Sequence, residues 1–317
     1  NLGVAAWNHE GNISGYWPGI CTESCNEDDF TLGSNAASVE VWHRSKDYTD
    51  RDGDGFAAWE DCDDNDASIP TYADADCDGI YDVEILSTGN THSCVINNDE
   101  HVQCWGSDDY NETSTTPTGT FKQISAGSHH TCGLKTNNKV ECWGYDQFNQ
   151  VSDTPNDNFV QVSAGGLHSC AIDTSGQAQC WGHNGNGQIT PPEGTFNQIS
   201  AGQSHTCAIN TEDSIECWGD DNYGQITELP SGTFKQISAG QYHTCAVRTN
   251  NEIECWGVDS GGYPNSGQVT DTPASTFVQI SSGHFNSCAI DNAGSIQCWG
   301  GDAQGQITNT PSGVFQQ

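Results

Sequence analysis

The stretch Ser200-Ala-Gly-Gln-Ser-His205-Thr-Cys207-Ala-Ile209, followed by Ile215-Glu-Cys217-Trp218-Gly219, decides the fold of this 317-residue chain. Versions of it recur every 37 to 43 residues, and in each version the two cysteines are ten positions apart. The copies begin at Ser87, Ser125, Ser163, Ser200, Ser238 and Ser281. A constant core with connections of variable length is typical of a stacked repeat architecture, because insertions collect in loops.

Each copy predicts a β-hairpin closed by a disulfide. Pairing Cys207 with Cys217 also places Ile209 opposite Ile215, and the alternation of side chains along a strand puts all four on one face. Directly opposed strand residues are close enough for a disulfide to join them. The predicted bridges are Cys94–Cys104, Cys132–Cys142, Cys170–Cys180, Cys207–Cys217, Cys245–Cys255 and Cys288–Cys298. A zinc array is the alternative, but a copy offers two thiols and at most one histidine at this spacing.

Each copy also contains a further short strand before the hairpin, as in Phe196-Asn-Gln-Ile-Ser200, and a turn-rich segment after Trp-Gly, such as Gly187-Gln-Ile189. Three or four short antiparallel strands, repeated six times, predict an all-β chain with a β-propeller of six recognisable blades over residues 83–317. The strand period and the many glycines exclude a helical solenoid.

The repeated pattern, a strand with Ser-Ala-Gly-x-x-His-Thr/Ser, a hairpin and Trp-Gly-x-x-x-x-Gly-Gln, resembles the propeller repeat of the regulator of chromosome condensation family. The resemblance covers Val83 to Phe315, about three quarters of the chain. It implies a propeller that usually has seven blades, one of them a composite completed by segments from both chain ends. The family includes nuclear exchange factors, secreted inhibitors and bacterial surface proteins. A cysteine pair in every copy departs from its pattern and points outside the cell, so no exchange-factor residue is carried over.

The composition also indicates an extracellular or cell-surface location. Hydrophobic residues make up 33% of the chain, below the roughly 45–50% of ordinary domains, and sixteen cysteines supply the missing stabilisation as disulfides. The chain has no methionine and no apolar stretch near the ~18 residues of a membrane span. We therefore expect a mature secreted chain, its signal peptide removed, without membrane insertion. Glycosylation sequons begin at Asn12 and Asn111.

The formal charge of −35 further limits the partners. It disfavours nucleic acid and anionic membrane surfaces, and suits divalent cations or a saline medium.

Residues 47–82 form an acidic module with the pattern of calcium loops. The run from Asp50 to Asp61 has oxygens at positions 1, 3 and 5, a glycine at 6, a carbonyl at 7 and an acid at 12. The predicted ligands are Asp50, Asp52, Asp54, the Phe56 carbonyl and Asp61 in one loop, and Asp74, Asp76, Asp78, the Ile80 carbonyl and Asp82 in the other. Because Asp61 replaces the usual glutamate, Asp63, Asp64 or Asp66 could complete the site. Hard oxygen ligands favour calcium over copper or zinc.

This acidic stretch resembles a metal-binding repeat of bacterial secreted and surface proteins, and a solvated linker is the alternative. Four cysteines outside the propeller repeats allow three connectivities. The preferred pairs are Cys62 with Cys77 and Cys21 with Cys25.

Two repeated residue types invite a functional reading. His92, His130, His168, His205 and His243 recur two positions before the first cysteine, with Asn286 in the sixth copy. They could ring a metal, but we expect a repeated hydrogen bond within each blade. Trp105, Trp143, Trp181, Trp218, Trp256 and Trp299 could stack on carbohydrate, but one tryptophan per blade favours packing between blades.

These features predict a secreted, calcium-stabilised, disulfide-linked propeller that serves as a structural or interaction module and is not an enzyme. Residues 1–46 form an arm that belongs to no blade, and Gly313–Gln317 resembles the start of another inner strand. Together they predict strand exchange between copies and a head-to-tail filament; an arm that completes its own propeller is the alternative.

Two rival functions stay open. One is a secreted enzyme acting on polysaccharide, although no Gly-x-Ser-x-Gly, phosphate-loop or His-Glu-x-x-His motif is present. The other is an inhibitor or adhesin that binds an extracellular protein or glycan.

Overall fold

The chain separates into two compact units, Asn1–Asp82 and Val83–Gln317. The structure is a computed structural model that describes residues 85–97, 99–259, 267–302 and 305–313, together with three strands near the N-terminus. Those strands are β1 (Gly3–Trp7), β2 (Ile13–Pro18) and β3 (Ser38–Val41), which form an antiparallel sheet in the order β2-β1-β3. The predicted calcium loops and Cys21, Cys25, Cys62 and Cys77 lie outside the described residues.

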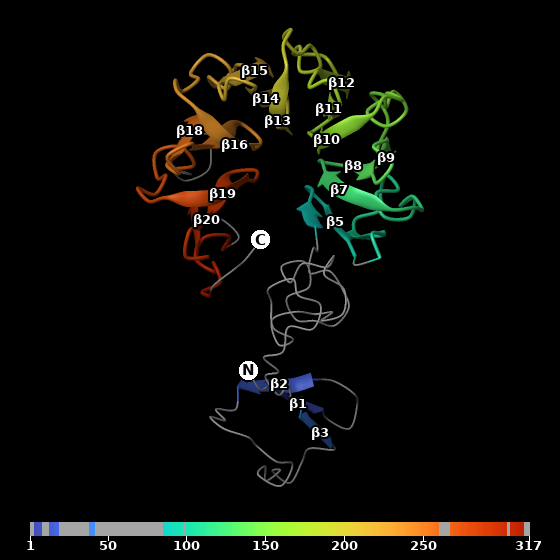
Figure 1. Cartoon of the computed structure of the whole chain (residues 1–317), viewed down its shortest axis with the longest axis vertical. Helices are drawn as coiled ribbons and strands as arrows, with labels where there is room; N and C mark the ends of the chain where they lie inside the picture. The colour runs from blue at the N-terminus through green and yellow to red at the C-terminus, as the bar shows by residue number, and fades with distance from the viewer. Residues whose placement is uncertain are drawn as a thin grey trace, which may run out of the picture. The chain divides into compact units, whose positions relative to one another are not determined.

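The repeat region folds into six three-stranded antiparallel sheets, which follow one another around a common centre like propeller blades (Figure 1). The inner strands are β4 (Ile85–Thr88), β7 (Phe121–Ala126), β10 (Phe159–Ala164), β13 (Phe196–Ala201), β16 (Phe234–Ala239) and β19 (Phe277–Ser282). The middle strands are β5 (His92–Ile96), β8 (His130–Lys135), β11 (His168–Asp173), β14 (His205–Asn210), β17 (His243–Arg248) and β20 (Asn286–Asp291). The outer strands are β6 (Val102–Gly106), β9 (Val140–Gly144), β12 (Ala178–Gly182), β15 (Ile215–Gly219), β18 (Ile253–Gly257) and β21 (Ile296–Gly300).

The hairpins have the predicted register and disulfides. In the fourth blade Cys207 pairs with Cys217 and Ile209 with Ile215. The Cα atoms of the two cysteines are 4.1 Å apart, and the predicted pair is bonded in all six blades. The sequence prediction of these six bridges is confirmed.

Five inner strands carry a one-residue bulge at their second position. In β13, Phe196 pairs with Asn210 and Gln198 pairs with Ile209, which leaves Asn197 outside the ladder. The bulge residues are Lys122, Val160, Asn197, Lys235 and Val278, and all are exposed. The bulge therefore turns one side chain per blade away from the packed sheet.

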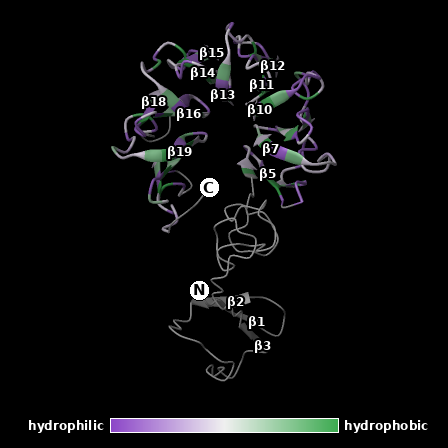
Figure 2. Ribbon diagram, in the orientation of Figure 1, coloured by the Kyte–Doolittle hydropathy of each residue, from purple (hydrophilic) through white to green (hydrophobic). Residues whose placement is uncertain are grey.

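The hydrophobic core lies between neighbouring blades. The trailing face of the fourth blade (Cys207, Ile209, Ile215) packs against the leading face of the fifth, formed by Phe234, Ile237, Ala246 and Trp256. Trp256 Nε1 also donates a hydrogen bond of 2.9 Å to the carbonyl of Gln225, in the loop between these blades. The hydrophobic residues lie mainly on the strands, and the connecting loops are largely hydrophilic (Figure 2). Five of the six repeated tryptophans are buried in such interfaces, which confirms their predicted packing role for those five.

Candidate functional site

The repeated histidines join each blade to the next. His168 Nε2 lies 2.8 Å from Thr206 Oγ1, and the Thr206 hydroxyl donates to the Gln188 carbonyl, so the histidine is the donor. The equivalent pairs are His92–Thr131, His130–Ser169, His205–Thr244 and His243–Ser287. The prediction of a hydrogen bond within each blade is wrong, because the histidine faces the neighbouring middle strand rather than its own sheet.

Burial keeps these histidines neutral. Desolvation lowers the pKa of His130 and of His168 to about 3, and the pKa of His205 and of His243 to about 4. Among the described residues, no three His, Cys, Asp or Glu side chains are grouped so that they could hold a metal ion. The five repeated histidines are therefore part of the scaffold that joins the blades around the central cavity.

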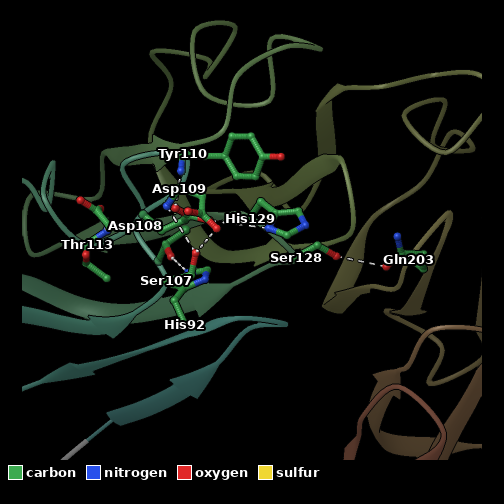
Figure 3. Close-up of polar contacts among 11 residues, drawn as sticks. His92, Ser107, Asp108, Asp109, Tyr110, Thr113, Ser128, His129 and Gln203 are labelled. Atoms are coloured by element: carbon green, nitrogen blue, oxygen red, sulfur yellow. Dashed lines mark hydrogen bonds and ion pairs between the residues drawn. The ribbon is translucent and has the colours of Figure 1, made fainter.

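One mouth of the propeller centre is formed by the loops that precede these histidines, and we call it the glycine mouth. It opens into a cavity of about 370 Å³ lined by the Gly-x segments of all six blades, such as Gly127-Ser128 and Gly202-Gln203. Backbone amides bridge its rim: Ser128 N donates to Gly165 O at 3.2 Å, and Gly166 N donates to Gly202 O at 3.0 Å. The Ser128 hydroxyl also donates to Gln203 Oε1 at 3.1 Å, which links the second and fourth blades (Figure 3).

A row of aromatic rings lies on the loops beside the glycine mouth. Tyr110 and His129 lie side by side, their ring centroids 5.2 Å apart (Figure 3). The row continues from Tyr110 to Tyr145 at 4.7 Å, from Tyr145 to Phe148 at 6.5 Å, and from Phe148 to His183 at 4.7 Å. We call Tyr110, His129, Tyr145, Phe148 and His183 the aromatic row. Tyr110 and Phe148 are among the most exposed large hydrophobic side chains of the described residues.

A buried carboxylate lies next to the aromatic row. Glu112 is fully buried, and its Oε2 accepts a hydrogen bond of 2.8 Å from the Tyr110 amide. Its Oε1 has no hydrogen-bond partner and lies 3.6 Å from His129 Nδ1. The equivalent position holds Gln150, Gln188, Gln225 and Gln268 in later blades. Sequence reasoning missed this pair, although the exchange of Gln for Glu in one copy of the repeat was visible.

The opposite mouth, at the hairpin turns, has a different character. Its cavity of about 790 Å³ is lined by the bulge residues Lys122, Val160, Asn197 and Lys235. Lys122 Nζ donates to Asn138 Oδ1 and Lys235 Nζ donates to Asn251 Oδ1, both at 2.6 Å. Lys135 pairs with Glu141, and Arg248 pairs with Glu254. With Lys139, which donates to the Asn156 and Asp157 carbonyls, these are all the lysines and arginines of residues 83–317.

The first and last blades each leave one face uncovered by the described residues. On the leading face of the first blade, Leu86 is 59% exposed and Trp105 is 52% exposed, although the equivalent Ile124 and Trp143 are 5% and 4% exposed. On the trailing face of the sixth blade, Cys288, Ile290 and Ile296 are half-buried, whereas Cys207, Ile209 and Ile215 are buried. All five pairs of consecutive blades share a hydrophobic core between them. The leading face of the first blade and the trailing face of the sixth have the residue types of the two halves of such a core, and the described residues leave both faces uncovered.

The family model for the regulator of chromosome condensation (RCC1) repeat matches residues 83–112, 121–150, 159–188, 196–225 and 234–268. The chain carries RCC1-type propeller repeats. A similar solved structure is the CRINKLY WD40 ectodomain of the Arabidopsis thaliana receptor kinase ACR4, with 26% identity and a TM-score of 0.58 over 70% of this chain and 86% of that one.

Two further solved structures show the same propeller architecture. The ectodomain of the Physcomitrella patens receptor kinase CR4 is 25% identical, with a TM-score of 0.59 over 71% of this chain and 66% of that one. Yeast RCC1 (Prp20), solved bound to Kap60, is 16% identical, with a TM-score of 0.56 over 68% and 69% of the two chains, and it shows the fold alone. No match was found among curated protein sequences. The described residues contain no helix with the length and apolar character needed to cross a bilayer.

Proposed function

We propose that this RCC1-type propeller is an extracellular, non-enzymatic interaction module that assembles with other copies of itself through the open faces of its first and sixth blades. Six disulfides support an oxidising compartment. The likeness to a receptor-kinase ectodomain agrees with a binding role outside the cell. Calcium, held by the acidic module at 47–82, would stabilise the N-terminal unit.

The exposure of Leu86 and Trp105 carries the proposal. In each of the other five blades the equivalent side chains contact the trailing face of the preceding blade. In the first blade these side chains have no such face against them among the described residues. Fully burying one such side chain stabilises by about 1.5–3 kcal/mol. A copy that offered the trailing face of its sixth blade would cover Leu86 and Trp105 with the residue types that cover Ile124 and Trp143. A contact between two unlike faces is heterologous and leads to head-to-tail growth.

The polar ladder between blades supports the same completion. Among the described residues, Ser93 stands where later blades accept the histidine hydrogen bond, and no histidine reaches it. Gln279 is equivalent to Gln123 and Gln161. The side-chain amide of each of these two glutamines makes two hydrogen bonds with the backbone of one residue in the following blade, Val162 for Gln123 and Ile199 for Gln161. The sixth blade thus offers Gln279 for the same pair of hydrogen bonds and the first blade offers an acceptor position at Ser93, although Asn286 replaces the histidine that would face Ser93.

Light scattering and analytical ultracentrifugation of the full chain, with and without calcium, test the proposal. We expect oligomers that grow with concentration, and dissociation in Leu86→Asp and Trp105→Ser variants. Val160→Asp is the matched control, since Val160 is 55% exposed at a bulge and belongs to no blade face. Deletion of residues 1–46 tests the contribution of the arm. A full chain that stays monomeric at high concentration, with calcium present, would rule out assembly and favour completion within one molecule.

A further inference from the structure

We infer that the glycine mouth binds a cationic segment, whose arginine or lysine side chains lie against the aromatic row. This inference rests on the proposed role as an interaction module. It does not depend on self-assembly, because the aromatic row is distinct from the open blade faces.

The positive charges of the propeller lie at one of its two mouths, whereas acids occur at both. Every lysine and arginine of residues 83–317 belongs to the hairpin-turn mouth or its turns. The loops that follow each Trp-Gly, at the glycine mouth, carry acids without any lysine or arginine. Six of these acids are Asp108, Asp109, Asp146, Asp220, Asp221 and Asp302. A surface with one sign of charge attracts ligands of the opposite sign and raises their association rate.

The aromatic row supplies faces for cations that the chain itself does not occupy. At the hairpin-turn mouth, Lys135 Nζ lies 5.5 Å from the centre of the Phe121 ring, and Arg248 Cζ lies 4.7 Å from that of Phe234. This fold thus already places cations over its rings. At the glycine mouth Tyr110 is 42% exposed and Phe148 is 37% exposed. An incoming guanidinium or ammonium group would find the same type of contact there.

Glu112 adds a negative charge beneath the row. Its carboxylate is fully buried, and Oε1 has no hydrogen-bond donor among the described residues. The nearest cation candidate is His129, whose Nδ1 is 3.6 Å away and also lacks a hydrogen bond. A buried charge that is incompletely compensated acts over a longer distance than a solvated one, because the surrounding dielectric is low. The later blades, with glutamine at this position, lack that charge.

The tilt of the rings favours a cation over a sugar. Neighbouring rings in the row are inclined at 64° to 72° to one another. Such edge-to-face rings do not form the flat platform on which a chain of sugar rings stacks. A planar guanidinium can instead lie against the face of a single exposed ring. A neutral glycan would also gain nothing from the net negative charge of these loops.

Calorimetric titration of the full chain with a hexa-arginine peptide, at low and at moderate salt, tests the inference. The informative variant is Glu112→Gln, since Gln150 and Gln225 at the same repeat position keep the loop hydrogen bond, from the Phe148 and Tyr223 amides. We expect Glu112→Gln and Tyr110→Ser each to weaken binding by roughly threefold to tenfold. The controls Glu212→Gln and Val160→Ser lie at the opposite mouth. They should change the affinity for hexa-arginine by less than about twofold, because the charge and the apolar group that they remove are far from the aromatic row.

Three outcomes would overturn the inference. The first is that hexa-arginine does not bind, and the second is that the control variants lose as much affinity as Glu112→Gln and Tyr110→Ser. The third is that a neutral hexasaccharide such as cellohexaose binds and is lost in Tyr110→Ser, which would assign the row to a glycan. Near-ultraviolet circular dichroism of each variant separates a binding loss from unfolding. None of these outcomes alters the light-scattering result, so failure here is distinguishable from failure of the assembly proposal.

Discussion

His168 of the third blade and Thr206 of the fourth are joined by a hydrogen bond of 2.8 Å, with both side chains fully buried. Equivalent bonds link each of the first five blades to its successor. The histidine must be neutral to stay buried there. The stability of the packing between neighbouring blades therefore depends on pH.

The first prediction concerns pH. The folded pKa of His168 and His130 is about 3, below the ordinary value near 6.5, so the unfolded chain binds more protons between these values. Stability is therefore complete above about pH 6.5 and is lost as pH falls. At pH 5 each such histidine costs up to about 2 kcal/mol. Calorimetry should show a lower melting temperature at pH 5 than at pH 7.5.

Titration of carboxylates with a lowered pKa, such as Asp108, affects stability only at a lower pH than this test covers. Backbone amides of Ser114 and Thr113 lower the pKa of Asp108 to about 2, so its contribution is lost only below its ordinary pKa near 4. A His168→Asn variant carries the residue that the sixth blade has at the same position, Asn286. Its melting temperature should depend less on pH than that of the unmodified chain. An unchanged melting temperature between pH 7.5 and pH 5 would contradict the prediction.

The second prediction concerns the rim of the glycine mouth. A Cβ atom on Gly165 would lie 2.5 Å from the Gly202 carbonyl oxygen and 2.7 Å from His168 Cε1. Gly165→Ala should therefore reduce the free energy of unfolding by about 1–3 kcal/mol. Gly283→Ala is the matched control, because at the same position of the sixth blade the nearest atom is 3.1 Å away. Equal losses in the two variants, measured by urea unfolding, would contradict the steric argument.

The third prediction separates the two environments of the repeated tryptophan. Trp181 is 4% exposed between the second and third blades, so Trp181→Ala should cost about 3–5 kcal/mol. Trp105→Ala should cost less than about 1 kcal/mol in dilute solution, because that ring is already half in water. A large loss for Trp105 in dilute monomer would show that the face is covered within one chain.

The fourth prediction concerns the disulfides. Replacing Cys207 and Cys217 by alanine should lower stability by about 2–3 kcal/mol, because a short loop is freed in the unfolded chain and the buried Cys207 sulfur is lost. The same change at Cys288 and Cys298 should cost less, since Cys288 is half-buried whereas the equivalent Cys207 is buried. Chemical denaturation of both variants measures the difference, and a larger loss in the sixth blade would contradict it.

The fifth prediction concerns calcium. The loop from Asp50 to Asp61 should bind calcium measurably by calorimetry at millimolar concentration or below, and Asp52→Asn should abolish that binding. Asp99→Asn, which removes an exposed acid of the first blade, is the control and should leave binding unchanged. An absence of calcium binding in the unmodified chain would show that the acidic module is a solvated linker.

The hairpin register was predictable because it depends only on local periodicity. Cys207, Ile209, Ile215 and Cys217 share a face by strand alternation, and that face is the one buried. The partner of each histidine was not predictable in this way, since alternation gives a side chain's face but not which blade lies beyond it. Glu112 and His129 meet for the same reason: one lies in the loop after the first blade and the other in the second blade.

The bulge in five of the six inner strands has a consequence for how the protein can vary. Because Lys122, Val160, Asn197, Lys235 and Val278 stand outside the ladder, none of them has a directly opposed residue in the neighbouring strand. The five blades accordingly show a base, an aliphatic and an amide at this position on the same backbone. Substitutions at these positions can therefore change the hairpin-turn mouth one blade at a time, without altering the glycines and tryptophans that assemble the blades.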